Sequence, residues 1–79
     1  MIRFLGENEY TVAYLDDEYA GFIRVQRNEI IEVSVLPQHR RKGIATALYN
    51  HVGRPNHSLF RTDEGNAWAH AVGGFIPNE

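Results

Sequence analysis

Three adjacent cations, Arg40, Arg41 and Lys42, stand directly before Gly43, where a strand-like segment leads into a helix-like one. Glycine lets a ligand approach the backbone where a side chain would block it. The free N–H groups at the start of a helix and the positive end of its dipole both favour an anion. This turn therefore predicts a phosphate or diphosphate site, and the alternative is an ordinary solvated basic turn.

The residues on either side of the turn predict the elements that hold it. Residues 30–36 are rich in β-branched and apolar side chains, as expected of a strand buried on both faces, and Pro37 ends the run. After the turn, apolar residues recur at helical spacing until Gly53 and Pro55 stop the helix. These helical apolar residues are Ile44, Ala45, Leu48, Tyr49 and Val52.

The rest of the chain predicts a single compact domain over residues 1–79 of the α/β (α+β) class. We expect an antiparallel meander of three strands, then a helix, a brief parallel strand reached by a crossover, a second helix and a last strand, in the order β-β-β-α-β-α-β. The meander strands are 10–15, 19–26 and 30–36, with 2–5 suited to an edge strand; the later elements are 58–60, a helix from Thr62 or Asp63 to Val72, and 75–76.

Composition narrows the classes of function. A net charge of −2 and a pI near 6.0 argue against general nucleic-acid binding, which usually needs a basic face. The chain has no cysteine, and its four histidines are not spaced as metal ligands, so we expect neither thiol catalysis nor a metal. The N-terminal segment is too short and too polar for a signal peptide or membrane span, which favours a cytoplasmic protein.

Residues 33–48 resemble the signature of the GNAT superfamily of acyl-CoA-dependent N-acyltransferases. The run Arg40–Ala45 fits the pattern Q/R-x-x-G-x-G/A, and Val35, Pro37 and Leu48 stand at the family's spacing. Residues 10–25 are similar to the family's second and third strands. The two helices that usually follow the first strand, and that wall the acceptor site in larger members, have no counterpart here.

The resemblance implies that acetyl-CoA is the cosubstrate. Its pyrophosphate would lie against the N–H groups and cations of the turn, and its pantetheine arm would bond to backbone groups where the central strand splays from its parallel neighbour. The coenzyme-binding residues implied in this way are Ser34, Val35, Leu36, Arg40, Arg41, Lys42, Gly43, Ile44, Ala45 and Thr46.

Acetyl transfer from a thioester to an amine needs a base, a donor for the developing oxyanion and a proton for the leaving thiolate. The family carries a carboxylate at the position of Glu32 or of Glu29 in different members, and a backbone N–H near Val35 is its usual oxyanion donor. Glu32 is equally expected to face solvent or to pair with Arg24. The family's usual acid, a tyrosine, is absent; counting back from the C-terminal Gly-Phe pair puts His70 in its place, with a surface role as the alternative.

Two flanking features have structural and functional interpretations. Trp68 is expected to pack on the sheet, with a part in lining the acyl pocket left open. A polar cluster near the second crossover has contact with the acceptor or the coenzyme as its functional interpretation; its members are His57, Ser58, Arg61 and Thr62.

We therefore expect an N-acetyltransferase that acts on a primary amine, with a protein lysine or N-terminus favoured because the acceptor side lacks its usual helices. A homodimer partner would be another way to complete that wall. The alternatives are a non-catalytic acyl-CoA-binding or regulatory module and a small interaction protein on the same fold.

Overall fold

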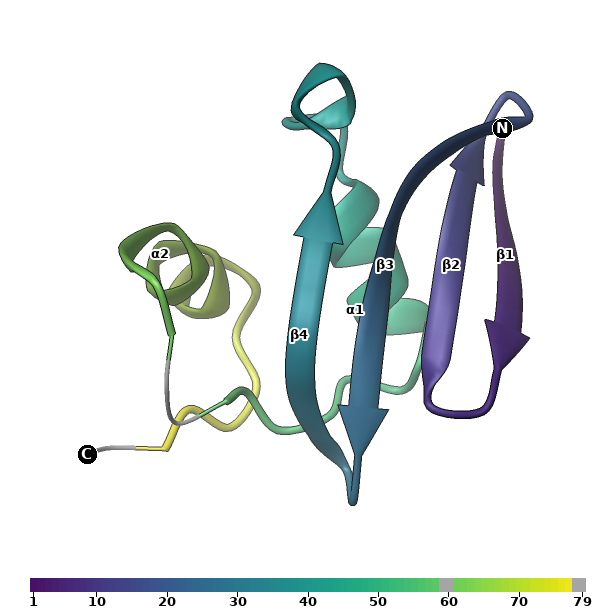
Figure 1. Cartoon of the computed structure of the whole chain (residues 1–79). Coiled ribbons are helices and arrows are strands. Elements are labelled where there is room, and N and C mark those ends of the chain that lie inside the picture. The colour runs from purple at the N-terminus through teal and green to yellow at the C-terminus, as the bar shows by residue number, and fades with distance from the viewer. Residues whose placement is uncertain (59–60, 78–79) are drawn as a thin grey trace.

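The computed structural model describes residues 1–58 and 61–77, and in it four strands form one antiparallel sheet in the order β1-β2-β3-β4 (Figure 1). The strands are β1 (Ile2–Glu7), β2 (Tyr10–Leu15), β3 (Glu18–Gln26) and β4 (Glu29–Val35). The edge strand is therefore longer than the sequence indicated, and the meander has four strands rather than three.

Two short turns set the register of the central hairpins. Asp16 and Asp17 join β2 to β3 with φ of 50° and 67°, and Arg27 and Asn28 join β3 to β4 with φ of 51° and 62°. Two consecutive left-handed residues form the type of turn whose twist matches that of the flanking strands. The expected turn at the acidic break after β2 is confirmed.

Helix α1 (Ile44–His51) packs across one face of the sheet and closes the core. Its buried residues contact the inward side chains of β2, β3 and β4, which alternate along each strand. The buried core residues of this layer are Ala13, Ala20, Ile23, Ile30, Ile44, Leu48 and Tyr49. This helix lies where the apolar spacing predicted it.

Helix α2 (Asp63–Val72) also matches its prediction, and lies beside β4 rather than across the sheet (Figure 1). The Thr62 hydroxyl accepts a hydrogen bond of 3.0 Å from the Gly65 N–H and so caps the helix. None of the helices in the described ranges is long and apolar enough to cross a membrane.

A cluster of rings at Gly73 holds α2 in place. The Tyr49 hydroxyl donates to the Gly73 carbonyl at 3.3 Å, and Nε2 of the buried His57 lies 2.6 Å from the same oxygen. The Tyr49 and His57 rings stack at 4.9 Å, and Trp68 meets both edge-on at 5.4 Å. This Gly73 cluster fixes α2 opposite the outer edge of β4, and it gives His57 a structural place.

After α1 the described chain departs from the expected order. One parallel bridge joins Glu29 to Asn56, with the Ile30 N–H donating to the Asn56 carbonyl at 2.8 Å, and then His57 leaves β4 and donates its N–H to Phe75 at 3.0 Å. The predicted last strand at 75–76 is wrong, because that segment has this contact in place of a ladder.

The predicted parallel strand has only one described residue, Ser58, which is not in a strand; residues 59–60 lie outside the described residues. The order β-β-β-α-β-α-β is therefore not confirmed, and the described residues form an α+β domain of order β-β-β-β-α-α.

Candidate functional site

An open cleft of about 770 Å³ lies between the C-terminal half of β4 and helix α2, and the turn before α1 closes one end. It forms because, among the described residues, β4 pairs with the segment that follows α1 only at the bridge between Glu29 and Asn56, and His57 then turns away from β4. The lining residues are Val33, Ser34 and Val35 from β4; His39, Arg40, Arg41, Gly43, Ile44, Ala45 and Thr46 from the turn and α1; and Thr62, Glu64, Gly65, Ala67 and Trp68 from α2.

The outer edge of β4 presents backbone groups to this cleft. The Leu36 N–H donates to the Ala20 carbonyl on β3 at 2.9 Å, and the backbone groups of successive strand residues point to opposite edges. The N–H and C=O groups of Val33 and Val35 therefore point away from β3. The Val35 carbonyl accepts a hydrogen bond of 3.2 Å from Nε of Arg40, which ties the basic turn to the strand end.

Gly43 opens the turn toward the cleft. It is the N-cap of α1 in a left-handed conformation with φ of 76°, and it provides no side-chain cap. A Cβ at Gly43 would meet no atom within 4 Å, so the space beside it is free. The first N–H groups of α1 are thus uncapped beside the cations of Arg40 and Arg41, which is an arrangement that favours an anion.

His39 is a cleft residue that sequence reasoning missed. Its ring is buried, its Nε2 lies 3.2 Å from a carboxylate oxygen of Glu18, and that contact lacks hydrogen-bond geometry. Nδ1 has no hydrogen-bond partner in the described structure. Because Glu18 is remote in sequence, no local pattern could have indicated this pair.

Helix α2 supplies the opposite wall through Glu64, Gly65 and Trp68, which share one helical face. The indole Nε1 of Trp68 donates to the Thr46 hydroxyl at 3.2 Å and so links the two helical walls. Trp68 both packs against the core and lines the cleft, as the two interpretations of this residue allowed. The helical spacing predicted that these residues share one side of α2. It did not predict that this side would be turned toward the cleft and α1.

All the coenzyme residues expected from the sequence line this cleft, except Leu36 and Lys42. The N–H of Leu36 is used in the ladder with β3, and Lys42 is exposed. Lys42 contributes weakly to a lowered pKa of Asp16, which is caused mainly by the hydrogen bond and charge of the N-terminal amine.

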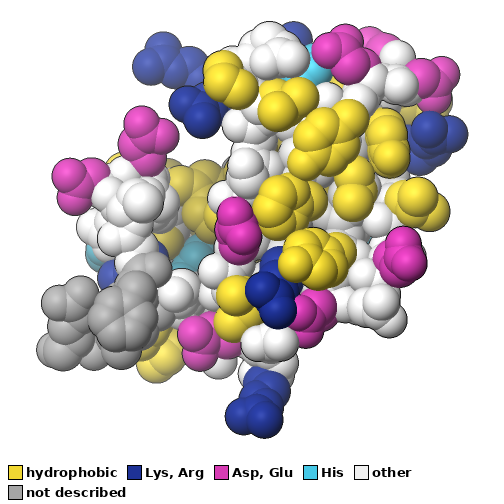
Figure 2. Space-filling view, in the orientation of Figure 1, with side chains coloured by type: hydrophobic (Ala, Val, Ile, Leu, Met, Phe, Trp, Pro, Cys, Tyr) yellow, Lys and Arg dark blue, Asp and Glu magenta, His cyan; other side chains and the backbone are white. Residues whose placement is uncertain are grey.

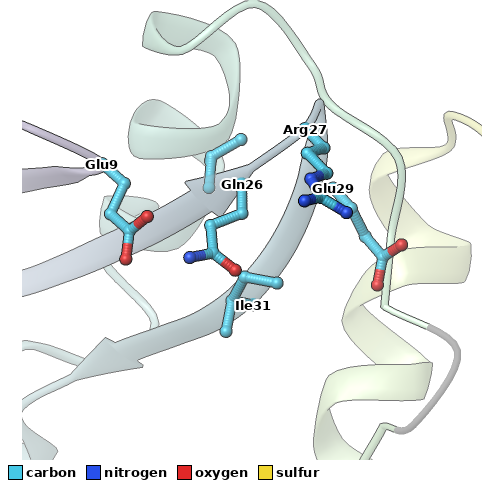
Figure 3. Close-up of a pocket in the computed structure, with 6 residues that line it drawn as sticks. Glu9, Gln26, Arg27, Glu29 and Ile31 are labelled. Atoms are coloured by element: carbon cyan, nitrogen blue, oxygen red, sulfur yellow. The ribbon is translucent and has the colours of Figure 1, made fainter.

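The expected catalytic residues lie elsewhere. Glu29 lines a separate hollow of about 660 Å³ at the start of β4, together with Glu9, Gln26 and Arg27 (Figure 3). Glu32 is exposed on the sheet face opposite α1, and His70 is exposed on α2. None of Glu29, Glu32 and His70 lines the cleft.

Arg24 pairs with Glu9 rather than with Glu32, although Glu32 is its register partner on β4. The Arg24–Glu9 contact is 2.5 Å long. Hydrogen bonds from Gln26 and Arg24 lower the pKa of Glu9, and the bond to Glu9 raises the pKa of Arg24. The Glu9 carboxylate is therefore held ionised at one end of the exposed sheet face.

Comparison with known proteins shows which family the chain belongs to. The family model described as "Acetyltransferase (GNAT) domain" matches residues 6–73, which include the cleft and both helices. No curated protein and no solved structure gave a match. Since the family model covers most of the sequence, the chain belongs to the GNAT family of acetyltransferases.

Proposed function

We propose that this protein is an acetyl-CoA-dependent N-acetyltransferase that moves the acetyl group directly to a primary amine, on a protein lysine or N-terminus. One observation carries the proposal. The uncapped start of α1, the left-handed Gly43 and the outward backbone groups of Val33 and Val35 all face one cleft.

The groups around the cleft fit coenzyme A. The uncapped N–H groups of α1, with Arg40 and Arg41, suit a diphosphate. The outward N–H and C=O groups of Val33 suit an amide of the pantetheine arm, which would bond as an added strand does, and this leaves the outward N–H of Val35 for the reacting carbonyl. The volume of about 770 Å³ is within the range of small-molecule sites.

The coenzyme supplies an acetyl group activated as a thioester. The transfer forms a C–N bond and breaks the C–S bond, while the amine loses a proton and the thiolate gains one. We assign oxyanion stabilisation to the outward N–H of Val35. Glu32, the neighbour of the cleft residue Val33, is the first candidate to accept the proton, and Glu29 is the second.

His70 is the candidate that returns a proton to the thiolate. Because His70 and both carboxylates stand outside the cleft, water must carry each proton between them and the reacting groups.

The test is release of coenzyme A thiol from acetyl-CoA in the presence of small amines and of lysine-containing peptides. The chain has no cysteine, so a thiol reagent reads the product without background from the protein. We expect thiol release that requires both acetyl-CoA and an amine, with the acetylated amine identified by mass spectrometry. The absence of turnover with every amine would contradict the proposal.

A coenzyme-binding module without turnover is the second candidate, and the placement of the expected catalytic residues favours it. Glu29, Glu32 and His70 are all exposed and outside the cleft. Tight binding of acetyl-CoA with no thiol release would select this function.

A further inference from the structure

The sheet face opposite α1 is apolar and uncovered in the described structure. Both helices lie elsewhere, with α1 behind the sheet and α2 beside β4 (Figure 1). Figure 2 shows hydrophobic side chains gathered over the strands of this face. Exposure reaches 60% at Leu5, 42% at Tyr10, 39% at Tyr19 and 40% at Ile31, so several large apolar side chains are in water. A surface of this kind marks an interaction site.

Part of this face forms a hollow of about 390 Å³ with aromatic walls. Tyr10, Val12, Tyr19 and Phe22 line it, and Glu7 adds a carboxylate. The Tyr10 and Phe22 rings lie 5.8 Å apart with planes inclined at 54°. Aromatic faces beside a carboxylate attract an organic cation through the ring quadrupoles and the negative charge together.

Aromatic rings on the same face already hold cations. The Arg24 guanidinium lies 5.4 Å from the centre of the Tyr10 ring, and that of Arg3 lies 5.3 Å from the centre of the Tyr14 ring. The charge of each arginine is balanced by a carboxylate, since Arg24 pairs with Glu9 at 2.5 Å and Arg3 pairs with Asp17 at 3.3 Å.

Two exposed carboxylates, Glu7 and Glu32, are left on the face with no ion pair among residues 1–58 and 61–77. The face therefore carries a net negative charge beside its exposed apolar side chains. A nucleic acid or an anionic membrane would be repelled by this surplus of negative charge. If a second copy bound across a two-fold axis, the same negatively charged patch would be present on both sides of the interface, and the two patches would repel each other.

We propose that this face docks a cationic polypeptide segment and that a lysine or arginine side chain of the segment enters the aromatic hollow. The further step, that this segment is the amine acceptor, rests on the proposed function. The docking face and the coenzyme cleft adjoin each other at β4, because Glu32 of this strand lies on the docking face and its neighbour Val33 lines the cleft. The width of four strands is about 15 Å, which five extended residues span.

The test is the fluorescence anisotropy of a labelled 12-residue peptide of alternating lysine and glycine, measured without coenzyme, with a glutamate–glycine peptide as its control. We expect the lysine peptide alone to bind. Tyr19→Leu removes one aromatic wall and Tyr19→Phe keeps it, so the first should weaken binding by about threefold or more and the second should leave it unchanged.

The same charge change at two places provides a second control. Glu7→Gln removes the carboxylate of the hollow and should also weaken binding by about threefold, whereas Asp63→Asn, at an exposed position on α2 outside both the hollow and the cleft, should not. Circular dichroism establishes that each variant is folded. Equal binding of the two peptides, or wild-type binding by both Tyr19→Leu and Glu7→Gln, would overturn the proposal. So would a dimer in sedimentation equilibrium that dissociates on Tyr19→Leu.

These outcomes are separable from those of the proposed function. Gly43→Asp, in the coenzyme turn, should weaken coenzyme binding by about tenfold or more and leave peptide binding intact. If the lysine peptide binds but no amine is acetylated, the docking surface stands and the enzymatic assignment fails. If small amines are acetylated but the peptide does not bind, the docking surface fails alone.

Discussion

Glu32 and Glu29 lie on the same strand as the cleft residues, yet both carboxylates are exposed. A base that acts through water still depends on the carboxylate charge, so Glu32→Gln should lower kcat by about tenfold to a hundredfold. The affinity for acetyl-CoA should not change, because Glu32 does not line the cleft. Steady-state kinetics and a direct binding titration separate the two effects.

Glu29→Gln and His70→Ala provide the comparison. A larger loss of kcat in Glu29→Gln would move the base to the start of β4. Wild-type turnover in all three variants would show that proton transfer depends on other residues.

The Glu9–Arg24 pair predicts a pH dependence of stability. Hydrogen bonds from Gln26 and Arg24 lower the pKa of Glu9 in the folded protein from its ordinary value of 4.5. The unfolded chain therefore binds this proton more readily, and the stabilisation is present above pH 4.5 and is lost as the pH falls through the lower folded value. Urea unfolding between pH 6 and about pH 3 should show a smaller acid loss for Glu9→Gln than for the wild type. An unchanged acid dependence in that variant would exclude this pair as its source.

The roles of residues that depend on the local sequence pattern were predictable. The basic turn with Gly43 was read directly from sequence, because a glycine between cations and a helical repeat restricts what the backbone can do. The contacts of His39 with Glu18 and of Trp68 with Thr46 were not predictable, since each joins segments that only the fold brings together.

At the scale of elements, helix α2 is held at its C-terminal end, where Tyr49 and His57 contact the Gly73 carbonyl. Trp68 provides another attachment, through its hydrogen bond to Thr46 on α1. Trp68→Phe removes the hydrogen bond to Thr46 and part of the ring contact, and should lower the free energy of unfolding by about 1 kcal/mol. Trp68→Ala removes the whole contact with the Gly73 cluster and should cost about 3 kcal/mol.

Chemical denaturation measures both changes. Thr46→Val supplies the control, because it removes the acceptor of the same hydrogen bond and leaves the ring in place. Combined with Trp68→Phe it should add little further loss. Fully additive losses would show that the hydrogen bond does not couple the two helices.

Helices α1 and α2 and the hairpin strands followed from periodicity and turn residues, which act locally. The last strand did not form as predicted. Gly73 and Gly74 both have positive φ, and the chain after them turns back toward His57. Phe75 then accepts a single bond from His57. Whether a short apolar run pairs with a strand depends on such distant partners, and no pattern in the run itself records them.

At the scale of the whole molecule, the small domain should respond strongly to its ligand. A ligand present at a hundred times its Kd, and bound only by the folded state, adds about 2.7 kcal/mol. For a domain of this size that corresponds to a rise in Tm of about 10 °C or more. Differential scanning fluorimetry with acetyl-CoA measures the shift. A Tm that does not rise at any concentration of acetyl-CoA would be inconsistent with coenzyme binding.

The most direct measurement compares two substitutions at Gly43 by isothermal titration calorimetry with acetyl-CoA. Asparagine and aspartate are nearly equal in size, tolerate the left-handed backbone and cap helices well, so the two variants differ mainly in charge. If the coenzyme diphosphate binds at the start of α1, Gly43→Asp should bind acetyl-CoA at least about tenfold more weakly than Gly43→Asn. Equal affinities in the two variants would contradict the assignment of the cleft.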